Sequence, residues 1–145
     1  MSAWTPELEE RARLMVSRYP EPRSALGPLL YLAMRRDGYL TEEGMRRVAD
    51  LTGATPAQVR GVATFYTMCK LSPPGRYLIS ICTSISCHLL RGREVLAAVE
   101  EETGVLDGHT GEDGLFSVEH VECIGACAGA PALQVNYELV EGVTP

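Results

Sequence analysis

The sequence predicts an α/β (α+β) fold in which an N-terminal helical bundle, residues 1–72, precedes a compact domain of strands and helix, residues 73–145. Three observations support this prediction, two on the division of the chain and one on its being a folded protein. Apolar residues recur at helical spacing through the front half of the chain. The stretch Ser72-Pro73-Pro74-Gly75 ends that pattern, and beyond it the spacing changes to the alternation typical of strands. The composition, 46% hydrophobic and 22% charged over 145 residues, is typical of a folded globular protein.

Four helices are predicted in the front half from residues that commonly begin and end helices. Threonine followed by proline favours a helix start, and this pair occurs at Thr5-Pro6 and Thr55-Pro56. Ser24 is expected to cap the second helix and Thr41 the third. With stops at proline or glycine, the predicted helices cover about residues 6–18, 24–37, 42–53 and 56–66.

The back half is predicted to begin with a strand, followed by a helix and three further strands. Residues 76–82 and 115–122 have strand character, and residues 89–103 carry apolar positions at helical spacing. A loop rich in glycine and aspartate, 107–114, connects the helix to the second strand. Residues 132–136 and 137–140 suit a short hairpin.

Charge and hydropathy exclude several classes of partner. The formal net charge of −6 and the isoelectric point near 5.1 argue against nucleic acid, whose binding proteins carry a basic face. No apolar run approaches the roughly 20 residues needed to cross a bilayer, and the first residues do not resemble a signal peptide. We therefore expect a cytoplasmic protein without direct membrane insertion. Thr144-Pro145 repeats the helix-opening pair with no helix after it, so either the natural chain is short or a terminal segment is missing.

Two pairs of cysteines carry the chemistry that the sequence suggests. Cys82 and Cys87 follow the first predicted strand, and Cys123 and Cys127 follow the second. The strand arrangement brings both loops to the same edge of one sheet, so four thiolates can converge there. Four sulfurs can hold a [2Fe–2S] cluster or a zinc ion, or form two disulfides.

The spacing of the pairs favours a binuclear cluster without excluding zinc. Structural zinc sites usually repeat C-x2-C, whereas this chain has C-x4-C and C-x3-C. The second loop is made of glycine and alanine, so its backbone N–H groups can approach the sulfurs and tune a reduction potential. A thiol–disulfide exchange site requires C-x2-C at a helix start, and a Rieske centre requires two histidine ligands. Neither pattern is present. A structural zinc-binding interaction module and a thiol–disulfide oxidoreductase are kept as the alternative functions of the four cysteines.

The other candidate residues favour structural roles. His88, at a helix start, and His109, in the glycine-rich loop, are expected to be ordinary polar residues, and His120 lies on a strand. Cys69 stands outside both pairs and is expected to behave as a small buried hydrophobe. The segment 65–68, with Phe65, Tyr66 and Met68, is expected in the core or an interface.

The stretches "CTSISCHLLRG" and "VECIGACAGAPALQVN", with "DGYLTEE" and "GVATFYTM" upstream, resemble the [2Fe–2S] subunit of bacterial NADH:quinone oxidoreductase, the E or 24-kDa-type subunit of respiratory complex I. Related subunits occur in NAD-linked hydrogenases and formate dehydrogenases. The resemblance implies a helical N-terminal region ahead of a thioredoxin-like [2Fe–2S] ferredoxin domain. It also implies that Cys82, Cys87, Cys123 and Cys127 are the cluster ligands.

Function is implied by the same resemblance. The cluster is expected to exchange electrons with the FMN of a partner flavoprotein subunit, which also binds NADH. This chain would then be a redox subunit of NADH dehydrogenase without the catalytic centre itself. The expected partners are that flavoprotein and other peripheral-arm subunits, and the expected place is the cytoplasmic side of the inner membrane within a membrane-bound complex.

Overall fold

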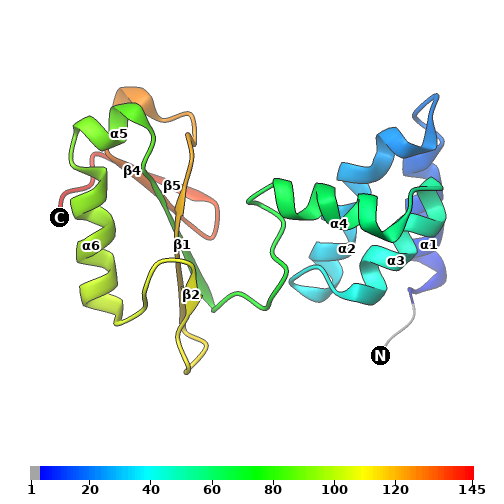
Figure 1. The fold of residues 1–145 in the computed structure, drawn as a ribbon, viewed down its shortest axis with the longest axis horizontal. Coiled ribbons are helices and arrows are strands. Elements are labelled where there is room, and N and C mark those ends of the chain that lie inside the picture. The colour runs from blue at the N-terminus through cyan, green and yellow to red at the C-terminus, as the bar shows by residue number, and fades with distance from the viewer. Residues whose placement is uncertain (1–3) are drawn as a thin grey trace. The chain divides into compact units, whose positions relative to one another are not determined.

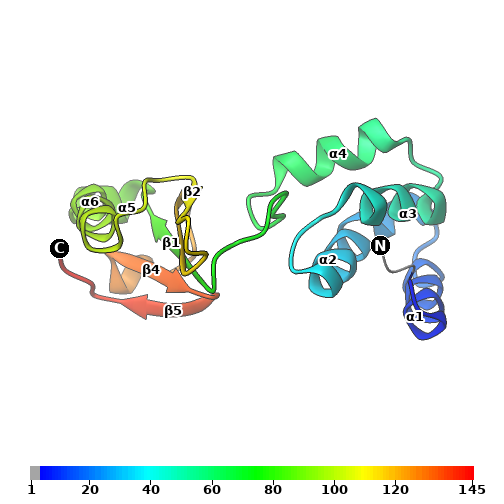
Figure 2. The same ribbon diagram turned by 90° about the horizontal axis from the view of Figure 1, so that it is seen from below.

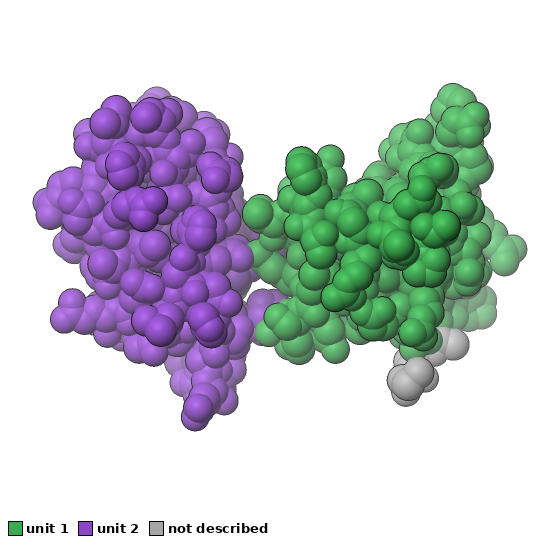
Figure 3. Space-filling view, viewed as in Figure 1, with its two compact units in different colours: residues 1–73 green, residues 74–145 purple. Residues whose placement is uncertain are grey.

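The computed structural model describes residues 4–145, and the chain divides into two compact units, residues 1–73 and 74–145 (Figure 3). The first unit is helical, and the second contains the five strands of the described chain (Figure 1). Whether each unit is an independent domain stays a prediction. None of the helices among residues 4–145 is both long and apolar enough to span a bilayer.

Helices of the first unit begin largely where the sequence predicts. They are α1 (Pro6–Val16), the 3-10 helix η1 (Pro22–Ala25), α2 (Leu26–Asp37), α3 (Glu42–Thr52) and α4 (Pro56–Phe65). The side chains of Thr5 and Thr41 accept hydrogen bonds from the first turns of α1 and α3. Thr55 and Gln58 form a reciprocal capping box at the start of α4. The threonine caps are therefore confirmed.

The second helix begins differently from the prediction. Ser24 lies inside η1, and α2 begins at Leu26 without a side-chain cap, so the predicted Ser24 cap is wrong. Pro22 provides the physical reason. Its ring fixes φ near the helical value, which starts a helical turn two residues before Ser24.

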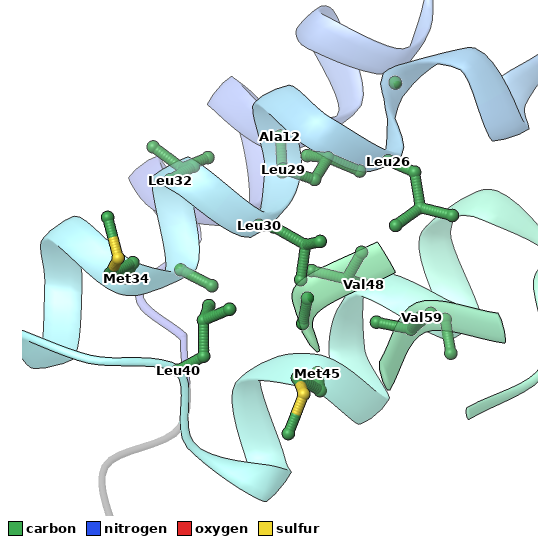
Figure 4. Packing of buried hydrophobic residues seen from close by; sticks show 14 of the residues in the cluster. Ala12, Leu26, Leu29, Leu30, Leu32, Met34, Leu40, Met45, Val48 and Val59 are labelled. Carbon is green, nitrogen blue, oxygen red and sulfur yellow. The ribbon is translucent and has the colours of Figure 1, made fainter. Parts of the chain in front are cut away.

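The core of the first unit lies between α1, α2, α3 and α4 (Figure 4). Leu29 and Leu30 of α2, Val48 of α3 and Val59 of α4 are fully buried. At the end of α4 the side chain of Phe65 is 76% exposed, and Tyr66 and Met68 after it are also exposed, so the expectation that the segment 65–68 belongs to the core is wrong. Its alternative, an interface, stays a prediction.

The second unit is a five-stranded sheet in the order β2-β3-β1-β4-β5. The strands are β1 (Tyr77–Cys82), β2 (His109–Thr110), β3 (Phe116–Val121), β4 (Ala132–Val135) and β5 (Glu138–Glu141), with a 3-10 turn η2 (Cys127–Gly129) before β4. Strands β1 and β3 are parallel and joined through α6 (Gly92–Thr103), as a parallel pair requires. The remaining neighbours are antiparallel.

Helix α6 packs on one face of this sheet (Figure 2). Val95 of α6 is buried against Ile81 of β1, Val118 of β3 and Leu133 of β4.

The predicted helix 89–103 is interrupted in the structure. A short helix α5 (Ile85–Leu89) precedes it, and α6 begins only at Gly92, because Arg91 takes a left-handed φ of 73° that no α-helix continues through. The two-residue strand β2, inside the predicted loop 107–114, was also not predicted.

Candidate metal centre

Strand register brings the two cysteine loops together. Cys82 is the last residue of β1 and pairs with Val121, the last residue of the parallel strand β3. Cys123 therefore follows at the same edge of the sheet. Strand β4 runs antiparallel to β1 with Ile81 opposite Leu133, so the chain segment between Cys127 and β4 returns to that edge as well. The predicted convergence of the two loops is confirmed.

The first pair is buried. Cys82 and Cys87 are each 3% exposed, and their thiols lie side by side. Burial raises the pKa of the Cys87 thiol, and the neighbouring Cys82 adds to the rise, while the N–H of Ala132 acts in the opposite direction by donating to the sulfur. In the metal-free chain these surroundings favour the neutral form of Cys87, which must lose its proton when a metal binds.

The second pair is exposed. The Sγ atoms of Cys123 and Cys127 are 3.9 Å apart, far beyond the bond length of a disulfide. Two sulfurs on one tetrahedral metal at about 2.3 Å each lie roughly 3.7 Å apart, so this separation suits two ligands of a single iron. The N–H of Gly125 donates to Cys123 Sγ at 3.4 Å. The expected contact between the small-residue loop and a sulfur is confirmed.

The two pairs are neighbours, yet they do not surround one point. Cys82 and Cys87 share a buried cluster with Ala126, and the charge of Cys127 acts on the Cys87 thiol. Within residues 4–145, however, no three His, Cys, Asp or Glu side chains are gathered closely enough for one metal ion. A zinc tetrathiolate needs four sulfurs around one ion, whereas a [2Fe–2S] cluster needs two sulfurs at each of two irons. Two neighbouring thiol pairs can supply the two sulfurs that each iron of such a cluster needs.

The histidines and the fifth cysteine take other roles. His120 Nδ1 lies 2.6 Å from Asp107 Oδ2, and its backbone N–H donates to the same carboxylate, so Asp107 holds this side chain. His88 lies on α5 with an exposed side chain. Cys69 packs against the core of the helical unit but is only half-buried, which is less than expected. The sequence did not predict the hydrogen bond from the N–H of Ala132 to the Cys87 sulfur, because the position of Ala132 depends on the register of β4.

Comparison with known proteins matches residues 12–145 to the family described as thioredoxin-like [2Fe-2S] ferredoxins. The chain is 42% identical over 138 residues to the E subunit of the NADH-quinone oxidoreductase of Mycobacterium tuberculosis, covering 95% of this chain and 55% of that protein. It is 40% identical over 131 residues to NADH-quinone oxidoreductase subunit 2 of Thermus thermophilus, covering 88% of this chain and 72% of the relative. It thus spans about half the length of the mycobacterial relatives that it matches.

A solved structure shares the fold. A chain of an NAD+-reducing [NiFe]-hydrogenase in the air-oxidized state superposes with a TM-score of 0.67 at 19% identity, over 80% of this chain and 20% of the other. Since the family match extends over both units, and the two thiol pairs converge at one sheet edge, the chain belongs to the thioredoxin-like [2Fe-2S] ferredoxins, whose cofactor is a [2Fe–2S] cluster.

Proposed function

We propose that this chain is an electron-transfer subunit of an NADH:quinone oxidoreductase. In this proposal Cys82 and Cys87 hold one iron of the [2Fe–2S] cluster, and Cys123 and Cys127 hold the other. The observation that carries the assignment is the meeting of two separate thiol pairs at the end of β1 and β3. When bound, the cluster supplies a site that takes up and releases one electron at a time.

The surroundings of the sulfurs support a redox role. The N–H groups of Gly125 and Ala132 each donate to a sulfur, and such bonds stabilise the negative charge that reduction increases. No nucleophile–base pair is needed for this function, because the protein's task is to hold and insulate the redox group. The nicotinamide chemistry is assigned to a partner flavoprotein that binds FMN and NADH.

Reconstitution with iron and sulfide tests the ligand assignment. The full chain should hold about two irons and two sulfides and give an EPR signal after one-electron reduction. Cys87→Ser and Cys127→Ser should each lower cluster content at least about tenfold or change the EPR signal. The matched control is Cys69→Ser, because Cys69 packs on the helical core and should leave the cluster intact. A colourless wild-type chain that binds stoichiometric zinc instead would contradict the proposal.

The assembly is tested separately from the cluster. Affinity purification from native cells should recover an FMN-containing flavoprotein together with peripheral-arm and membrane subunits, on the cytoplasmic side of the inner membrane. A second candidate is the equivalent subunit of a NAD-linked hydrogenase, favoured by the shared fold with the NAD+-reducing enzyme. Recovery of hydrogenase or formate dehydrogenase subunits alone would replace the respiratory assignment and retain the cluster.

A further inference from the structure

Gly92, the first residue of α6, lies against the backbone of both cysteines of the buried pair. A Cβ atom placed on Gly92 would lie 2.8 Å from the carbonyl oxygen of Cys87 and 2.9 Å from that of Cys82. Both distances are shorter than a carbon atom and a carbonyl oxygen tolerate. The obstructing atoms belong to the main chain, so they cannot rotate away as the end of a flexible side chain would.

Conformational freedom does not explain the glycine. Its φ lies outside the left-handed region, and the first position of a helix accepts any ordinary residue. The left-handed residue of this turn is its neighbour Arg91, with a φ of 73°. Close approach of the helix to the cysteine loop is therefore the physical reason for a glycine at this position.

The elements on both sides of this contact are held in place. Helix α6 is fixed by Val95, which is 2% exposed and packs against Ile81, the residue before Cys82. Helix α5, which carries Cys87, is joined to α6 by a turn in which the N–H of Arg91 donates to the carbonyl of His88 at 3.2 Å. An added methyl group would have to separate the α6 start from the two cysteine carbonyls.

We propose that Gly92 is a positioning residue for the Cys82–Cys87 pair. By leaving no side chain between α6 and the two carbonyls, it lets the helix hold the end of β1 and helix α5 at the separation that brings the two thiols side by side. The role of Gly92 in cluster binding rests on the proposed function, in which Cys82 and Cys87 are ligands. Its effect on the geometry of the two thiols does not depend on that function. The three atoms nearest to a Cβ on Gly92 all belong to Cys82 and Cys87, so the second pair, Cys123 and Cys127, serves as an internal reference.

The test compares the two thiol pairs within one iron-free chain. Wild type and Gly92→Ala are equilibrated in glutathione redox buffers, and differential alkylation with mass spectrometry measures the disulfide fraction of each pair. Gly92→Ala should lower the equilibrium constant for the Cys82–Cys87 disulfide about tenfold, the order of effect of one methyl group forced into a packed site. The constant for Cys123–Cys127 should change less than about twofold.

Two control variants separate positioning from general effects of the substitution. Gly61→Ala adds the same methyl group to a helix where nothing lies within 4 Å, and it should change neither pair. Arg91→Gly keeps the left-handed turn and should also leave the first pair unchanged. An unchanged first pair in Gly92→Ala overturns the inference. Equal losses in both pairs, including those caused by unfolding of the unit, also overturn it.

A second readout uses the reconstituted chain. Gly92→Ala should lose its cluster to a chelator at least about tenfold faster than wild type and should shift the EPR spectrum, because the geometry of one ligand pair changes. If wild type itself binds no iron and sulfide, the proposed function fails. The glutathione measurement on the iron-free chain still decides on Gly92 in that case.

Discussion

At the scale of single residues, the four cysteines of the centre differ in how far solvent reaches them. Cys82 and Cys87 are buried, whereas Cys123 and Cys127 are exposed. In the iron-free chain we expect iodoacetamide to modify the exposed pair at least about tenfold faster, because only thiolates react and burial raises the pKa of Cys87. Peptide mass spectrometry over time measures both rates. Equal rates at the two pairs would contradict this difference in burial.

A second residue-scale prediction concerns the ion pair between Glu9 of α1 and Arg47 of α3. The guanidinium donates to both carboxylate oxygens and holds the pKa of Glu9 below its usual value of 4.5. The stabilisation is therefore complete above the unfolded-state pKa and is lost as pH falls through the lower, folded-state pKa. Glu9→Gln should lower the free energy of unfolding by about 0.5–1 kcal/mol at pH 7. The difference from wild type should vanish in strong acid.

Trp4 allows this measurement to report on the helical unit alone. It is the sole tryptophan and is buried in that unit's core, so its fluorescence during urea unfolding follows this unit. Glu42→Gln is the matched control, because the Glu42–Arg60 pair is more exposed and should contribute only a few tenths of a kcal/mol. An effect of Glu9→Gln that persists undiminished in acid would contradict the ion-pair explanation.

At the scale of elements, the capping box at the start of α4 makes a quantitative prediction. Thr55 accepts from the N–H of Gln58, and Gln58 accepts from the N–H of Thr55. Thr55→Ala should lower the free energy of unfolding of the helical unit by about 1 kcal/mol, the usual value for a lost N-cap. Thr64→Ala, at an exposed site within α4 with no cap, should change it by less than about 0.5 kcal/mol. A larger effect at Thr64 would argue against capping as the cause.

At the scale of the whole molecule, the two units each have a core of their own and only the second contains the candidate centre. We therefore expect residues 73–145, expressed alone, to fold and to assemble the cluster. Circular dichroism and iron and sulfide analysis measure this. A fragment that stays unfolded, or that needs residues 1–72 to retain its cluster, would show that the division into units is not a division into domains.

Net charge acts at this scale as well. The chain carries a formal charge of −6 before any cluster is counted, and a cluster with four thiolate ligands is anionic in both redox states. Adding an electron to such a site is unfavourable unless N–H donors compensate it. In the proposed ligand set, the hydrogen bonds from Gly125 and Ala132 to sulfur would supply part of that compensation, and both donors lie in the backbone between Cys123 and the start of β4.

The sequence by itself determined most of the elements and the candidate centre. Threonine–proline pairs and glycine stops are local features, so the starts of α1, α3 and α4 could be predicted from neighbouring residues alone. The two cysteine pairs follow strands that end at one edge of a sheet, and topology requires such ends to lie together. Where a local signal competed with another, as Ser24 did with Pro22, the prediction failed.

Only the tertiary structure decided which thiols are buried, which backbone N–H groups reach a sulfur, and why Gly92 carries no side chain. These features arise from the way the consecutive segments β1, α5 and α6 pack together and from their contact with β4, which is distant in the sequence. Residue spacing gives their order, whereas the distance between the α6 start and the carbonyls of Cys82 and Cys87 depends on how the helix packs on the sheet.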